Sequence, residues 1–171
     1  MNPGRGKQAR YLPARVTVAV LTYVPNQVGY CQGRFAVMRA CIESIIKHTE
    51  IPYDLMIFDN GSCADVISYL NGLHAAGKIR FLILSEQNIG KIGALKIIFN
   101  AAPGEIVAYC DDDIFFLPGW LQEHLRVIDS YPKTGAVTGM YIKPHMKEGI
   151  NATLAFSRKK GVKVERGNLI E

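Results

Sequence analysis

The sequence contains no apolar run of about 20 residues, the length that a helix needs to cross a membrane, so it predicts no transmembrane helix. The four cysteines include no CxxC pair and no spacing typical of a metal site. The N-terminal residues also lack the apolar segment of a signal peptide. Because Cys41 and Cys110 lie within apolar segments, we expect buried thiols in a reducing, cytoplasmic environment.

Acidic residues are missing from the first part of the chain, where none precedes Glu43. The formal net charge is +5, which suits an anionic partner such as nucleic acid, an acidic membrane or a phosphorylated small molecule. The basic residues have no interleaved aromatic side chains, which argues against a nucleic-acid partner. Peripheral membrane contact through the basic tails stays open. These basic residues are Arg5, Lys7, Arg10, Arg15, Arg34 and Arg39 near the start, and Arg158, Lys159, Lys160, Lys163 and Arg166 near the end.

The composition describes a globular protein with a well-formed core, because 49% of the residues are hydrophobic and 20% are charged. At 171 residues the chain has the length of one domain. We expect a flexible basic tail over 1–14, one main domain over 15–142 and a short C-terminal extension over 143–171.

Short β-branched segments alternate with segments of helical period, and this alternation predicts right-handed βαβ units. The expected fold class is α/β, with three α/β/α layers around a mainly parallel, Rossmann-like sheet. A long loop over 23–33 follows the first strand. The expected strands cover 16–22, 55–58, 79–84, 106–110 and 136–141, and the expected helices cover 34–48, 65–76, 91–102 and 120–130.

Three consecutive carboxylates, Asp111, Asp112 and Asp113, follow the apolar strand over 106–110. Adjacent carboxylates repel one another, and a divalent cation with oxygen ligands is the simplest compensation. In an extended turn Asp111 and Asp113 point the same way, so they are the expected metal ligands, with Asp112 pointing elsewhere. The plain structural alternative is a solvated acidic turn that caps the next helix.

Other polar residues also follow strands, and in parallel sheets ligands bind beyond the carboxyl ends of the strands. A carboxylate such as Asp59 can accept hydrogen bonds from a nucleotide base, Asp111 can meet ribose hydroxyls, and Asp113 can hold the cation of a diphosphate. Lys91 begins a helix, where anions are favoured. Each residue has a simpler alternative as a turn, cap or surface residue. The expected substrate-binding residues are Thr22, Tyr23, Asp59, Asn60, Asn88, Lys91, Asp111 and Asp112.

The order VTVAVLTY, FDNGS, SEQNIGKIGALKIIFNAAPGE and IVAYCDDD resembles family 2 type glycosyltransferases with the GT-A fold. The resemblance covers Val16 to Tyr141. It implies that 15–142 binds a nucleoside-diphosphate sugar, with Asp59, Thr22 and Tyr23 around the base, taken as uracil. It further implies Mn or Mg as the metal at Asp113, and inverting transfer of the sugar to the hydroxyl of an acceptor that the sequence does not identify.

Two features depart from that family's pattern. The loop over 23–33 is longer than usual, and it could gate or select the donor. No Glu-Asp pair follows Asp113 to supply the general base, and nothing around Glu148 or Glu165 supports that role. A shortened chain with a truncated acceptor region, a partner-dependent enzyme and a minimal transferase all stay open.

Other classes remain as alternatives. A non-catalytic nucleotide-sugar-binding domain is the main one, because the general base is not identified. A phosphatase of the haloacid dehalogenase type expects Thr or Val where Phe115 stands. A nucleotidyltransferase expects a glycine-rich, arginine-bearing loop after the first strand, and the loop here contains only Gly29 and Gly33.

Overall fold

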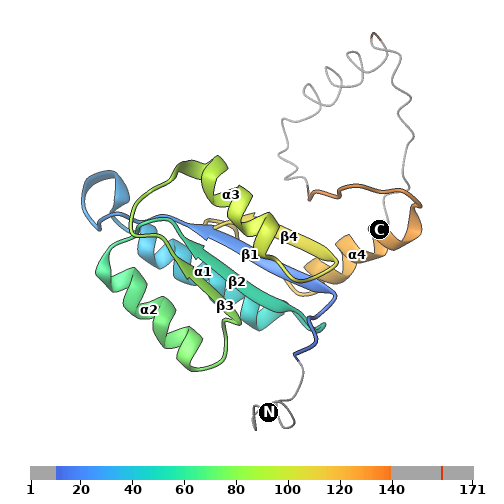
Figure 1. Cartoon of the computed structure of the whole chain (residues 1–171), viewed down its shortest axis with the longest axis horizontal. Coiled ribbons are helices and arrows are strands. Elements are labelled where there is room, and N and C mark those ends of the chain that lie inside the picture. The colour runs from blue at the N-terminus through green and yellow to red at the C-terminus, as the bar shows by residue number, and fades with distance from the viewer. Residues whose placement is uncertain (1–10, 140–158, 160–171) are drawn as a thin grey trace, which may run out of the picture. The chain divides into compact units, whose positions relative to one another are not determined.

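The computed structural model describes residues 11–139 and residue 159, and Figure 1 shows the order of their helices and strands. The predicted alternation of strands and helices is confirmed. Helices α1 and α4 and strand β1 have the predicted bounds, the other helices and strands up to residue 130 differ by one or two residues at one or both ends, and a short 3-10 helix lies within the predicted loop. The elements are β1 (Val16–Thr22), η1 (Gly29–Cys31), α1 (Arg34–His48), β2 (Asp54–Asp59), α2 (Ala64–Ala75), β3 (Phe81–Leu84), α3 (Gly90–Ala101), β4 (Ile106–Asp111) and α4 (Trp120–Ser130).

The four strands form one parallel sheet, as the sequence predicted, and the structure gives their order as β3-β2-β1-β4. Every residue of β1 and β2 is buried, which explains why both strands are almost continuously apolar. The register pairs Thr22 with Asp59 and Leu21 with Asp111. The polar residues at the ends of β1, β2 and β4 therefore lie at one edge of the sheet.

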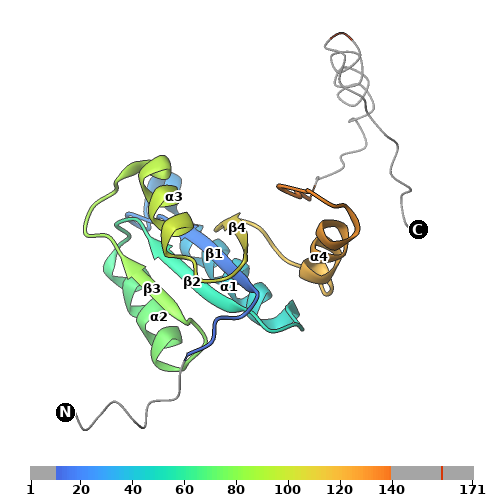
Figure 2. The same ribbon diagram turned by 45° about the vertical axis from the view of Figure 1, so that its right-hand side comes forward.

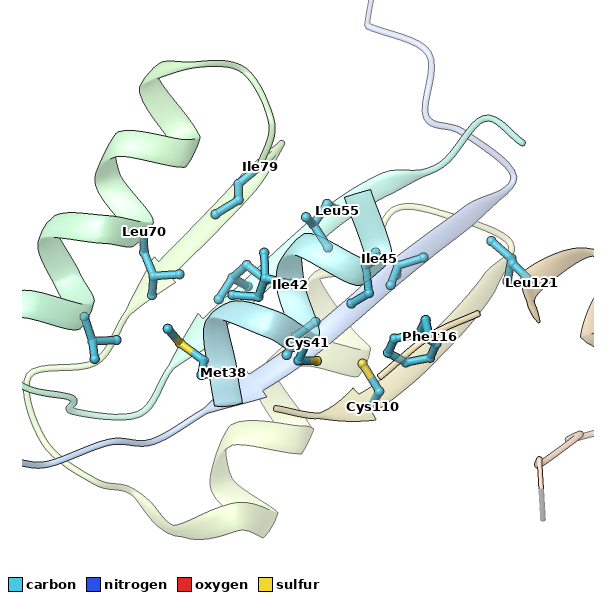
Figure 3. Packing of buried hydrophobic residues seen from close by; sticks show 14 of the residues in the cluster. Met38, Cys41, Ile42, Ile45, Leu55, Leu70, Ile79, Cys110, Phe116 and Leu121 are labelled. Carbon is cyan, nitrogen blue, oxygen red and sulfur yellow. The ribbon is translucent and has the colours of Figure 1, made fainter. Parts of the chain in front are cut away.

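The sheet lies between two helical layers. Successive strand residues point to opposite faces of the sheet, so alternate residues of β1 contact different helices. Val18 and Val20 of β1 pack in the cluster that contains α1 and α2, and Figure 3 shows Met38, Ile42 and Leu70 in that cluster. On the other face, Ala19 and Leu21 pack against Ala94 and Ile98 of α3. Figure 2 shows the same arrangement, with α3 separated from α1 by the sheet. The predicted three-layer α/β/α class is confirmed.

The helix α3 buries Ala94 and Ile98, whereas Ile92 and Phe99 are exposed. One expectation about an individual element was wrong. The expected strand over 136–141 is absent from its described part, 136–139, since none of the four strands pairs with it.

Val127–Glu171 forms a second compact unit, of which the structure describes the end of α4, the residues up to 139 and residue 159. A turn there is closed by Thr134, whose backbone N and Oγ1 donate to the carbonyl of Tyr131 at 3.2 and 2.7 Å. Most of the expected basic tail and C-terminal extension lies outside the described residues. Of the helices that are described, none combines the length and the apolar character needed to span a bilayer.

Candidate functional site

A cleft of about 350 Å³ opens at the carboxyl edge of the sheet. The central strand β1 has neighbours whose connecting helices cover opposite faces, and such a point is where parallel α/β sheets bind ligands. All the predicted site residues except Thr22 and Asp59 line this cleft. The lining residues are Leu21, Tyr23, Arg34, Asn60, Asn88, Gly90, Lys91, Asp111, Asp112 and Asp113.

Asp59 ends β2 completely buried, in register with Thr22. Its Oδ2 accepts hydrogen bonds from the backbone N–H groups of Gly61 at 3.2 Å and Ser62 at 3.0 Å. Asp59 thus closes the turn after β2, as its structural alternative predicted. Its Oδ1, however, has no hydrogen-bond partner among the described residues. A buried carboxylate oxygen without a partner is costly unless a ligand uses it.

Asn60 and Asn88 connect the end of β2 to the start of α3. Asn60 Nδ2 donates to Asn88 Oδ1 at 3.0 Å, and the backbone N–H of Ile89 donates to Asn60 Oδ1 at 2.9 Å. Asn88 Oδ1 also accepts from the N–H of Gly90 at 2.7 Å. These amides therefore shape one wall of the cleft and set where α3 begins.

Lys91 and Asp111 form an ion pair that also lines the cleft. Lys91 Nζ lies 2.8 and 2.9 Å from the two carboxylate oxygens of Asp111, and Tyr109 Oη donates to Asp111 Oδ1 at 2.5 Å. Partial burial pushes the pKa of Asp111 up, but the hydrogen bonds from Lys91 and Tyr109 outweigh it, and the pKa lies below its ordinary value. Burial, followed by the bond to Asp111, raises the pKa of Tyr109. Asp111 is therefore ionised at neutral pH.

Asp112 and Asp113 lie in a turn on the other side and share one cation, Arg34. Arg34 Nη2 lies 2.7 Å from Asp112 Oδ1, and Nη1 lies 3.6 Å from Asp113 Oδ2. Asp112 is buried and also accepts from the backbone N–H of Tyr23 at 3.4 Å. Burial raises the pKa of Asp112, and the charge of Arg34 opposes that rise.

The expected directions of the acidic triple were wrong. We expected Asp111 and Asp113 to point together and Asp112 to point elsewhere. Instead, Arg34 contacts both Asp112 and Asp113, whereas Lys91 contacts Asp111. The period-two argument fails because the chain leaves the extended conformation and turns after Asp111.

Arg34 is the site residue that the sequence interpretation missed, since it was grouped with the other basic residues near the start of the chain. One signal was available. Arg34 begins α1 with no acidic residue in the first turn, and a cation is unfavourable at that end of a helix. Such a residue indicates a carboxylate elsewhere in the chain.

The three carboxylates of the cleft are candidate metal ligands. Within the described residues, no group of three or more His, Cys, Asp or Glu side chains is arranged to hold a metal. Mg²⁺ commonly uses only one or two carboxylates when phosphate oxygens and water complete its shell. Asp113, about half exposed, and Asp111 both line the cleft, so each could supply a carboxylate to a site of that type although they pair with different cations.

The fold and the cleft define an open parallel α/β domain with a charged ligand site at its carboxyl edge. The chain belongs to the glycosyl transferase family 2, whose family model matches residues 31–168. This confirms the resemblance noted in the sequence, and the fold is that of GT-A glycosyltransferases. Family membership also argues against the phosphatase and nucleotidyltransferase alternatives.

Several relatives share this family character. The chain is 24% identical over 116 residues to the uncharacterized glycosyltransferase YwdF of Bacillus subtilis, covering 68% of this chain and 39% of the relative. It is 26% identical over 123 residues to the uncharacterized glycosyltransferase alr2836 of Nostoc sp., covering 72% and 37% respectively. The chain therefore spans well under half the length of these relatives.

Solved structures of S. aureus TarS share the fold. TarS 1-349 in complex with UDP aligns with a TM-score of 0.57 at 18% identity, covering 78% of this chain and 39% of that one. A complex with UDP-GlcNAc aligns with a TM-score of 0.55.

Proposed function

We propose that this chain is the donor-binding part of a nucleotide-sugar glycosyltransferase whose donor is a UDP-sugar. The observation that carries the proposal is one cleft at the carboxyl edge of the sheet, where three carboxylates meet two cations from helices on opposite faces. The TarS complexes with UDP and UDP-GlcNAc support the nucleotide part of the proposal.

We assign the uracil base of the donor to the inner part of the site. Uracil offers an imide N–H, and the unpartnered Oδ1 of buried Asp59 is an acceptor at the end of β2. Thr22 and Tyr23, at the end of the neighbouring strand, complete this region. Asn60 and Asn88 act by shaping the wall beside it.

The ribose and diphosphate are assigned to the acidic edge. Asp111 is ionised and presents its carboxylate to ribose hydroxyls, and Lys91 places a positive charge at the start of α3. Asp113, with Asp111, would hold a Mn or Mg ion together with phosphate oxygens. When bound, such an ion stabilises the negative charge that develops on the departing diphosphate.

The proposed reaction is an inverting transfer. The acceptor hydroxyl oxygen bonds to the anomeric carbon as the bond from that carbon to the diphosphate breaks, and a general base takes the hydroxyl proton. This base is unassigned, because Glu148 and Glu165 lie outside the described residues. A non-catalytic donor-binding domain is the alternative, and it is distinguished by the absence of turnover.

Calorimetric titration of the chain with UDP, with and without Mn, tests the donor site. We expect Mn to strengthen UDP binding in the wild type, and Asp113→Ala to remove most of that gain. UDP binding that neither Mn nor Asp113→Ala changes would contradict the metal assignment. Release of UDP from UDP-sugars, with and without sugar acceptors, then separates an enzyme from a binding domain.

A further inference from the structure

Arg34 has an unusual position for a cation. It is the first residue of α1, directly after Gly33 in the left-handed conformation at φ 83°. The N-terminal end of a helix carries a partial positive charge, so an arginine there is disfavoured. An interaction with anionic groups is needed to offset this cost.

The contacts of Arg34 within the protein leave part of its guanidinium exposed. The Nη2 edge of Arg34 is anchored on Asp112, whose side chain is 6% exposed, at 2.7 Å. The Nη1 atom faces Asp113 at 3.6 Å, which is longer than a hydrogen bond. The Arg34 side chain remains 32% exposed and lines the cleft. One edge of the guanidinium is therefore held in place while the other faces the ligand space.

Asp112 itself is poorly placed to contact a ligand. Its oxygens are used by Arg34 and by the backbone N–H of Tyr23, and it is 4% exposed. Its position instead restricts the orientation of the Arg34 side chain. Arginine binds phosphate groups well when its planar fork is oriented in advance, since less conformational freedom is then lost on binding.

We propose that Arg34 binds the diphosphate of the donor and that Asp112 is the positioning residue that orients the Arg34 guanidinium. This inference rests on the proposed function. It makes Arg34, from α1, the counterpart of Lys91, from α3, on the other side of the cleft. The competing explanation is that Arg34 only neutralises the buried charge of Asp112.

Binding of UDP and of uridine by the whole chain tests the role of Arg34. Arg34→Ala should weaken UDP binding about tenfold or more, the loss typical of a hydrogen bond to a charged group, because the variant lacks a diphosphate contact. Uridine binding, measured by ligand-observed NMR, should change less than about twofold by the same reasoning. Arg39→Ala is the matched control, since Arg39 lies on the same helix and pairs with Glu43 away from the cleft.

A double variant separates diphosphate binding from charge neutralisation. If Arg34 only neutralises Asp112, then Arg34→Ala combined with Asp112→Asn should recover wild-type UDP affinity. We expect no recovery, and we expect Asp112→Asn alone to weaken UDP but not uridine. Recovery in the double variant, or wild-type UDP affinity in Arg34→Ala, overturns the proposal.

The design also covers failure to fold and failure of the proposed function. Should Arg34→Ala not fold, Arg34→Lys keeps the charge beside Asp112 but loses the fork, and UDP affinity should fall severalfold at an unchanged Tm. Wild-type affinity in Arg34→Lys at unchanged Tm would then overturn the role of Arg34. A wild type that binds neither UDP nor uridine overturns the proposed function itself, and the role of Arg34 with it.

Discussion

Lys91 and Asp111 belong to different elements, α3 and β4, yet Lys91 Nζ lies within 2.8 and 2.9 Å of both carboxylate oxygens of Asp111. Lys91 precedes the buried residues Ala94 and Ile98 by three and seven positions, so all three lie on one face of α3. Packing that face on the sheet places the lysine over the end of β4.

Lys91→Met should weaken UDP binding with little loss of stability. The pair is solvent-exposed, at 55% for the lysine side chain and 46% for the aspartate, so its loss should cost less than about 1 kcal/mol of unfolding free energy. UDP affinity should fall about tenfold, because a charge-assisted phosphate contact is lost. Thermal unfolding and calorimetry measure the two effects. Lys96→Met, an exposed change on the same helix outside the cleft, should leave UDP affinity intact, and an equal loss there would contradict the assignment.

Asp59→Asn should weaken UDP binding and reduce the preference for UDP over CDP. The amide oxygen can still accept from Gly61 and Ser62, but the buried acceptor Oδ1 is replaced by a donor or lost. Competition titrations with the two nucleotides measure this preference. Asp54→Asn is the control, because Asp54 is a buried carboxylate at the opposite end of the same strand. That variant should keep the nucleotide preference, and an unchanged preference in Asp59→Asn would refute the base assignment.

Gly61→Ala should destabilise the protein and weaken UDP binding. Gly61 has φ 90°, and an added Cβ would lie 3.0 Å from the backbone N of Asn88. The strained conformation alone costs roughly 1–3 kcal/mol of unfolding free energy. Gly72→Ala in α2 is the matched control, since nothing lies within 4 Å of the added Cβ. It should stabilise the helix by about 0.5–1 kcal/mol. Denaturant unfolding measures the free energy of unfolding of both variants. An unchanged free energy in Gly61→Ala would be inconsistent with the close approach to Asn88.

Tyr11→Phe should produce a pH-dependent loss of stability. Burial and then the hydrogen bond to Asp54, at 2.5 Å, raise the pKa of Tyr11 from 10.0 to about 12. A raised pKa means that the stabilisation is complete below pH 10 and disappears as the pH rises towards 12. The difference in unfolding free energy between wild type and Tyr11→Phe should therefore shrink over that interval. Because Tyr11 is 43% exposed, the difference at neutral pH should be small.

Tyr30→Phe serves as the reference for that experiment, because Tyr30 is 96% exposed. Its stability should follow the wild type at every pH. Tyrosinate absorbance during an alkaline titration of each variant identifies which group ionises last. If the difference caused by Tyr11→Phe is constant between pH 10 and 12, the bond to Asp54 does not raise the pKa of Tyr11.

Local patterns predicted most of the fold. The β-branched apolar run located β1 to the residue, and the helical patterns located α1 and α4 to the residue, because these elements have a boundary defined by glycine, proline or a break in the apolar pattern. The start of β3 was placed two residues early, at Ile79 instead of Phe81. Residues such as Lys78 and Ile79 instead complete a turn by donating to the carbonyl of Leu73. That bond depends on the end of α2, which a pattern of apolar residues does not record.

By itself, the amino-acid sequence determined the parallel α/β architecture, the family and the edge of the sheet where polar residues collect. These properties follow from apolar periodicity and from the order of the strands, both of which are local. Only the tertiary structure decided which charges meet: Lys91 with Asp111, and Arg34 with Asp112 and Asp113. Those pairings depend on how α1 and α3 pack on opposite faces of the sheet and on the turn after β4, where a small change in backbone direction reassigns each carboxylate to a different partner.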